Sequence, residues 1–325
     1  MDTTGTFHYI DLTSIAPHTR PWNKVDISAT SYRLAARSRP VTDLRGLDPR
    51  TFSTDTSGFA LVRSPTSLPA SSFLVAPSSP AAPDPIRSTY YGEVASLLRA
   101  SLPDGRRIAD VVIFDHTVRR RDPAAPRGPV TQVHVDQTPG AAAARVRRHV
   151  APGKAEAYLR PGRRFQLINV WRAIGHAASD TPLAVIDWRS TAPADFVPVD
   201  LLYPARPDSA VGGVGGEGDD DDDRGKERRP EESTWGSAEG YEVRGETMAV
   251  APNESHRFYY AKDMAPDEAL LLKCYDSWGE GEPDGGREGI AVRTPHTAFV
   301  DPATPQDAPP RQSIEVRCLV FYEDE

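Results

Sequence analysis

Segments with the composition of β-strands recur along the chain on both sides of one long polar stretch, and this pattern restricts the fold most. Residues 129–136, for example, alternate in polarity as a half-buried strand does. Neither side of the polar stretch has enough strands to close a barrel alone. The sequence therefore predicts a mainly β protein with a double-stranded β-helix (jelly-roll, cupin-like) core and flanking helices. The other predicted strands are 109–118, 164–174, 182–188, 245–252, 256–261, 268–276 and 313–322.

Composition divides the chain into three regions. Residues 1–84 are rich in Pro, Ser and Thr and predict an extended arm packed on the core. Residues 85–322 predict the β-helix domain, which opens with a helix over about 85–101. Residues 206–236 are rich in Gly, Asp, Glu and Arg with few apolar side chains, so we expect a disordered acidic insertion within that domain.

The overall charge of −8 makes nucleic acid and anionic membrane surfaces poor partners, because their phosphates would repel the chain. A small molecule is the expected partner, and nothing in the sequence bears on the oligomeric state. The two cysteines lie in apolar segments, which does not suit a secreted disulfide scaffold. With no recognisable signal peptide or bilayer-spanning segment, we expect a cytoplasmic protein.

His134-Val135-Asp136 is the motif that carries chemistry. In a strand the side chains of His134 and Asp136 point to the same face and converge on one point. With a second imidazole they would form a facial triad of two histidines and one carboxylate. This triad leaves adjacent metal positions open and is typical of non-haem iron(II) oxygenases.

Two histidines compete to be the third ligand. His256 follows a predicted strand and turn and begins the segment 256–261, so it is the preferred candidate. His296 is the rival, and is otherwise read as a wall of the substrate pocket or as a loop histidine bonded to backbone. Trp171 and Phe299 are further candidates for the substrate pocket, although aromatic residues in strands usually belong to the core.

An oxygenase that uses 2-oxoglutarate also needs a buried cation for the distal carboxylate of that co-substrate. The sequence leaves this role open. The candidates are Lys273, within an apolar strand, Arg311 with Ser313 in an Arg-x-Ser pattern, Arg317, and Arg172. For Lys273 and Arg317 the competing interpretation is a structural ion pair.

Six motifs in order give the sequence a family resemblance. They are VHVDQT (133–138), INVWRAI (168–174), DTPLAVID (180–187), HRFYYAKDMAPDEALLLKCYDS (256–277), HTAFVDP (296–302) and PPRQSIEVR (309–317). Together they resemble the hydroxylase/desaturase-like oxygenases of fungal and bacterial secondary metabolism. This family includes gibberellin-desaturase-like and cephamycin-methoxylation-like proteins and an aziridine-forming amino-acid oxygenase.

The resemblance implies Fe(II), 2-oxoglutarate and O₂, with the metal held by His134, Asp136 and His256. It implies oxidation of an unactivated C–H bond of a small metabolite, with an amino acid among the possible substrates, by hydroxylation, desaturation or ring closure. Ala173 stands where the family usually has proline, and the acidic insertion is unusually long. The alternatives are a cupin-like metal-binding protein, or a metal enzyme on the same scaffold that does not use 2-oxoglutarate.

Overall fold

The computed structural model describes residues 2–75, 84–122, 128–205 and 236–324. Its strands form two sheets. Sheet A has nine strands in the order β1-β3-β11-β8-β13-β6-β10-β9-β2, and sheet B has five in the order β4-β12-β7-β14-β5. The strands of sheet A are β1 (Thr3–Ile10), β2 (Trp22–Lys24), β3 (Leu34–Asp43), β6 (His134–Val135), β8 (Leu183–Ile186), β9 (Phe196–Pro204), β10 (Tyr241–Val250), β11 (Phe258–Tyr260) and β13 (His296–Ala298). Those of sheet B are β4 (Phe59–Arg63), β5 (Ile108–Arg120), β7 (Phe165–Ala173), β12 (Glu268–Asp276) and β14 (Gln312–Tyr322).

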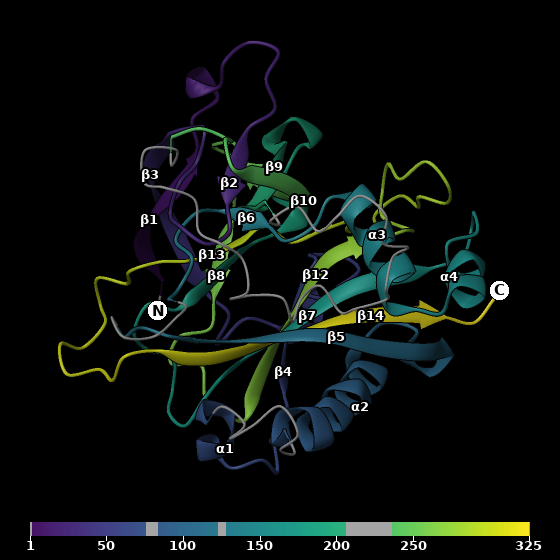
Figure 1. The fold of residues 1–325 in the computed structure, drawn as a ribbon. Coiled ribbons are helices and arrows are strands. Elements are labelled where there is room, and N and C mark those ends of the chain that lie inside the picture. The colour runs from purple at the N-terminus through teal and green to yellow at the C-terminus, as the bar shows by residue number, and fades with distance from the viewer. Residues whose placement is uncertain (1, 76–83, 123–127, 206–235, 325) are drawn as a thin grey trace.

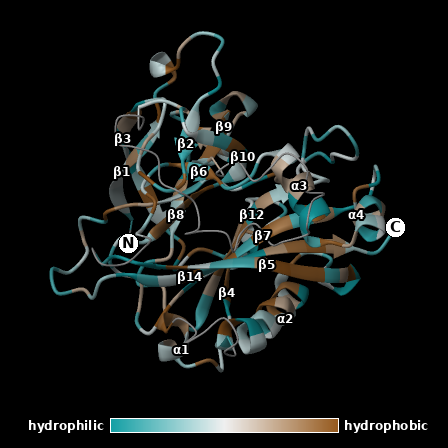
Figure 2. Ribbon diagram, viewed as in Figure 1, coloured by the Kyte–Doolittle hydropathy of each residue, from teal (hydrophilic) through white to brown (hydrophobic). Residues whose placement is uncertain are grey.

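The two sheets lie against each other, and the helices cover the outside of sheet B and one end of the molecule (Figure 1). Most strand pairs are antiparallel, and β11–β3 and β2–β9 are parallel. Figure 2 shows apolar residues concentrated on the strands of sheet B, whereas the surface loops are mainly polar. This is the mainly β, jelly-roll architecture that the sequence predicts. The helices are α1 (Ala70–Leu74), α2 (Tyr91–Ser101), α3 (Pro139–His149) and α4 (Pro152–Tyr158).

Helix α2 lies within the predicted helix over 85–101. A single π-helical turn, Ile86–Tyr90, precedes it, so the helical segment as a whole starts where the sequence indicates. Tyr90, Val94 and Leu98 are buried against sheet B. The helix ends at Ser101, because Leu102 precedes a proline and is extended.

Strand β14 separates two environments. Ile314, Val316, Cys318 and Val320 point outward to the apolar cluster beneath α2. Ser313, Glu315 and Arg317 alternate with them and therefore point inward, toward sheet A. A row of polar side chains thus reaches the space between the sheets. Farther along, Leu319 and Phe321 pack with α3 and α4 and close that end of the interior.

The region predicted as an N-terminal arm contributes strands to both sheets. β1 and β3 form an edge of sheet A, and β4 pairs with β12 in sheet B. Most of the predicted acidic insertion, 206–236, lies outside the described residues. Within the described ranges, every helix falls short of the length and apolar character that crossing a membrane requires.

Candidate metal centre

Three potential metal ligands come together between the sheets. His134 begins β6, Asp136 follows that strand directly, and His296 begins β13. β6 and β13 are neighbours in sheet A, with His134 and His296 as paired residues. One ligand atom from each of the three side chains lies within 4.8 Å of the other two. The arrangement offers two nitrogens and one oxygen from one side.

The same kind of backbone contact fixes both imidazole rings. The Nδ1 atom of His134 is 2.8 Å from the carbonyl oxygen of Gln132, and that of His296 is 3.1 Å from the carbonyl oxygen of Thr294. A carbonyl oxygen only accepts, so Nδ1 carries the proton in both rings. In the neutral rings the lone pairs are therefore on the Nε2 atoms, which face Asp136 at 3.4 Å and 3.8 Å. Backbone contacts of this kind fix the ring orientation of metal-binding histidines.

Asp136 remains ionised in this buried setting. Burial alone would raise the pKa of its carboxyl, but Arg317 and the two histidines outweigh burial and hold the pKa well below its usual range. Burial, together with the nearby His134, lowers the pKa of His296 and favours its neutral form. Burial also raises the pKa of the Cys274 thiol well above its usual value, so sulfur does not compete as a thiolate. The donor set fits a divalent iron ion.

The prediction that His256 is the third ligand is wrong in this structure, because both of its ring nitrogens are bonded elsewhere. Nε2 lies 3.0 Å from Oδ2 of Asp195, and Nδ1 lies 3.1 Å from the hydroxyl of Tyr9. His256 precedes β11, and β8 and β13 separate β11 from β6 in sheet A. The rival residue, His296, lies beside His134 and Asp136 at this position.

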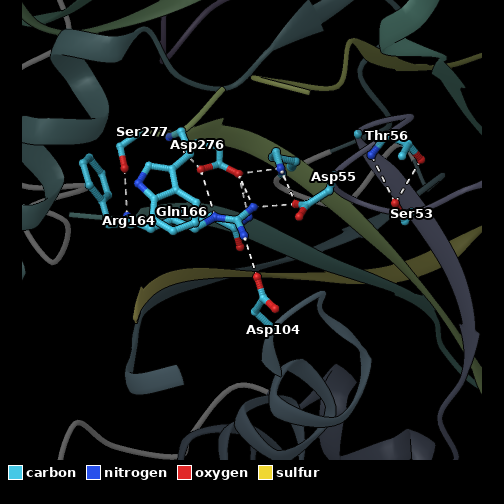
Figure 3. Close-up of polar contacts among 12 residues, drawn as sticks. Ser53, Asp55, Thr56, Asp104, Arg164, Gln166, Asp276 and Ser277 are labelled. Atoms are coloured by element: carbon cyan, nitrogen blue, oxygen red, sulfur yellow. Dashed lines mark hydrogen bonds and ion pairs between the residues drawn. The ribbon is translucent and has the colours of Figure 1, made fainter. Parts of the chain in front are cut away.

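Lys273 does not fit the role of 2-oxoglutarate anchor. Its ammonium group is fully buried and lies 2.6 Å from Asp276 and 2.9 Å from Asp55. Arg164 joins this cluster, and Figure 3 shows its guanidinium group meeting the carboxylates of Asp55, Asp104 and Asp276. Burial would raise the pKa of Asp276, but Lys273 and Arg164 outweigh it and lower that pKa to about 2. The competing interpretation, a structural ion pair, describes Lys273.

Arg172 and Arg317 are also committed to other partners. Arg172 lies beneath α2, where it donates to the hydroxyl of Tyr90 and to the carbonyl oxygens of Ser64 and Pro266. Because Ile168 and Val170 share this outward side of β7, Arg172 points away from the metal centre. The guanidinium group of Arg317 is shared among Asp136, Asp115 and Glu315. Arg317 therefore lies next to the metal centre, but its N–H donors are already bonded to these carboxylates and cannot also bind the distal carboxylate of 2-oxoglutarate.

Arg311 and Ser313 are the candidates that stay available. Arg311 is 2% exposed, and its Nη1 donates to the carbonyl oxygen of Thr181 at 2.7 Å. Its Nε is buried without a hydrogen-bond partner, which is the state expected of a group that awaits an acceptor. Burial and the nearby Arg119 lower the pKa of Arg311 to about 10, so it is still charged at neutral pH. Ser313 lies two residues farther along the same face.

The two aromatic candidates lie in different places. Trp171 is on the inward face of β7, and the guanidinium carbon of Arg311 is 5.7 Å from its ring centre. Its role in the substrate pocket stays a prediction. Phe299 packs instead with Phe7 and Tyr260. The same apolar cluster contains Ala184, which points to the opposite face of sheet A from Val185, the partner of His296. Phe299 is therefore a core residue, and the prediction that it lines the pocket is wrong.

Asn169 was missed by the sequence reading. It lies on the inward face of β7, is fully buried, and donates from Nδ2 to Oδ2 of Asp136 at 2.7 Å. Its own carbonyl oxygen is buried without a partner. The available signal was a polar side chain inside the otherwise apolar run LINVW, because a buried amide needs a polar environment.

Comparison with known proteins connects this geometry to one group of enzymes. The family model described as an oxidoreductase/YMDC permease-like domain matches residues 8–214 and 230–321. The chain is 30% identical to the hydroxylase/desaturase efuI of Hormonema carpetanum, over 91% of this chain and 88% of that protein. It is 28% identical to the Fe(II)/2-oxoglutarate-dependent dioxygenase nvfI of Aspergillus novofumigatus, over 73% of this chain and 67% of that protein.

A solved structure of the iron- and alpha-ketoglutarate-dependent endoperoxidase NvfI has the same fold. The TM-score is 0.71, with 23% identity and 99% of each chain covered. The gap in the family match, residues 215–229, falls inside the predicted acidic insertion.

Proposed function

The chain belongs to the hydroxylase/desaturase family of iron(II)- and 2-oxoglutarate-dependent oxygenases, and we propose that its iron is held by His134, Asp136 and His296. It is a non-haem dioxygenase of the kind that acts in fungal secondary metabolism, with 2-oxoglutarate and O₂ as co-substrates. The proposed substrate is a small metabolite. A cytoplasmic location and action without nucleic-acid or membrane partners stay predictions.

The observation that carries the metal assignment is the convergence of Asp136 with two preoriented Nε2 lone pairs. When bound, iron supplies the oxidising chemistry, in which O₂ and 2-oxoglutarate yield succinate, CO₂ and an oxidised C–H bond. The three side chains supply fixed donors on one side and leave the remaining positions to co-substrates.

For 2-oxoglutarate we propose Arg311 and Ser313 as the contacts of the distal carboxylate. The guanidinium group offers a planar pair of donors, and the hydroxyl offers a third. Both groups are almost completely buried, and a charge-assisted hydrogen bond is stronger in such surroundings than in water. The buried ring of Trp171 lies beside this position, with its centre 5.7 Å from the guanidinium carbon of Arg311.

Anaerobic titration tests this function directly. Purified protein with Fe(II) should develop a visible charge-transfer band when 2-oxoglutarate is added, and in air it should form succinate. His134→Ala should abolish both signals. His18→Asn is the matched control, since His18 is exposed and its φ of 61° suits asparagine. If iron binds but 2-oxoglutarate produces neither the band nor succinate, the chain is a metal protein of the alternative kind.

A further inference from the structure

Asn169 and Arg317 lie side by side on two neighbouring strands of sheet B. They are paired residues of β7 and β14, and the same row continues to Asp115 on β5. Both side chains point inward, and both donate to the same atom, Oδ2 of Asp136, at 2.7 Å and 3.3 Å. Because Asp136 belongs to the β6 segment of sheet A, this contact connects the two sheets at the metal centre.

The two oxygens of Asp136 therefore have separate environments. Oδ1 faces the imidazoles, 3.4 Å from Nε2 of His134 and 3.8 Å from Nε2 of His296. Oδ2 instead accepts hydrogen bonds from Nδ2 of Asn169 and Nε of Arg317. A carboxylate that binds a metal through both oxygens would have to give up these donors.

Arg317 cannot easily turn away to release Oδ2. Its Nη1 atom lies 2.9 Å from Asp115 and 3.1 Å from the hydroxyl of Thr117, and its Nη2 atom lies 2.7 Å from Glu315. Asn169 is fully buried. A planar guanidinium group with three acidic partners has one favoured orientation, so the position of Oδ2 is set by sheet B.

We propose that Asn169 and Arg317 are positioning residues that hold Asp136 as a one-oxygen ligand, an inference that rests on the proposed metal site. With Oδ2 engaged, Asp136 would offer a bound metal one oxygen instead of two. The position that a bidentate carboxylate would fill would then be left for a co-substrate. The metal affinity and coordination geometry of this chain thus depend on a cross-strand pair that does not itself bind metal.

Co(II) binding to the metal-free full-length protein tests the proposal, because the visible spectrum of Co(II) reports its coordination geometry without turnover. Asn169→Leu removes the donor but keeps the number and branching of the side-chain heavy atoms, and Asn169→Ala removes the donor without adding bulk. We expect both variants to bind Co(II) roughly 10- to 100-fold more weakly and with altered visible bands.

Gln166→Leu is the matched control. Gln166 is a fully buried amide on the same strand, and its Nε2 donates to the carboxylate of Asp276 at 2.7 Å, away from the metal centre. This variant should be less stable but should bind Co(II) with unchanged affinity and spectrum. Wild-type affinity and spectrum in both Asn169 variants would overturn the proposal, as would an equal loss in Gln166→Leu. If the wild-type protein binds no Co(II), the metal site itself fails.

Discussion

His134 and His296 lie opposite each other on neighbouring strands, with ring centres 4.5 Å apart. This pairing is the reason that we propose His296 as the third metal ligand. Residues far apart in the sequence become direct neighbours because β13 adds to sheet A beside β6. His256, two residues before β11, is held by Tyr9 and Asp195 and contributes to the packing of the N-terminal strands.

Alanine substitutions of His296 and His256 should therefore have opposite effects. His296→Ala should abolish Fe(II) or Co(II) binding, because it removes one of three donors. His256→Ala should retain metal binding but lower the free energy of unfolding by roughly 1–3 kcal/mol, since Asp195 and Tyr9 lose a buried partner. Equilibrium dialysis and urea unfolding measure the two effects. Loss of metal in His256→Ala, with retention in His296→Ala, would restore the ligand set expected from the sequence.

The stability of the protein should also fall at mildly acidic pH because of His256. Burial lowers the pKa of His256, even though Asp195 favours the proton. The unfolded histidine has a pKa of about 6.5, so as the pH falls below that value the unfolded state takes up the proton first and is favoured. The His256 contribution is complete above about pH 6.5 and declines below it.

His256→Gln isolates this effect, because glutamine does not titrate. The variant should lose less unfolding free energy than the wild type between about pH 7 and pH 5.5. Arg39, beside Tyr9, and Glu254, its ion-pair partner, are the other charges near His256 and are present in both proteins. Parallel stability curves for the two proteins would show that His256 is not the group responsible.

Arg311 should control the affinity for 2-oxoglutarate. Arg311→Met removes a charge-assisted contact worth about 1.5–3 kcal/mol, so the KM for 2-oxoglutarate should rise roughly 10- to 150-fold. Arg121→Gln is the control, because Arg121 is exposed and contacts the same Asp180 as the backbone of Arg311. Succinate assays at varied 2-oxoglutarate give the comparison. An unchanged KM in Arg311→Met would exclude Arg311 as the anchor.

Lys273 should matter for stability alone. Lys273→Met leaves Asp276 and Asp55 with one cation fewer in a buried network, which typically costs about 3–5 kcal/mol. Chemical unfolding should show this loss, whereas the KM for 2-oxoglutarate of the remaining folded enzyme should equal that of the wild type. A large rise in KM without a loss of stability would return Lys273 to the cofactor site.

The sequence was sufficient for the fold class and for part of the candidate metal centre. Alternating polarity identified the strands, and the spacing of His134 and Asp136 placed these two candidate ligands on one face. The third ligand depends on strand order, which the local sequence does not contain. His256 lies just before the short strand β11 and His296 begins the short strand β13, and the arrangement β11-β8-β13-β6 distinguishes them.

The cofactor candidates show the same limit. Buried cations were recognisable from their apolar flanks, but the face of the sheet to which each one points was not. Lys273 and Arg172 point to the outer side of sheet B, and Arg311 points inward with a free Nε. A shift of one residue along a strand moves a side chain to the other face, where it forms a structural ion pair instead of contacting a ligand. A bulge in β12 near Lys273 also interrupts the regular alternation from which the face could be inferred.

Because its side chains alternate between the two faces of sheet B, β14 carries residues of both the proposed co-substrate site and the proposed metal centre. Arg311, just before the strand, and Ser313, near its start, would bind the co-substrate. Arg317, which is paired with Glu315, contacts the proposed metal-binding carboxylate of Asp136. A slip of one residue would send all these groups into the apolar layer under α2. Insertions in β14 should therefore disable co-substrate and metal binding together.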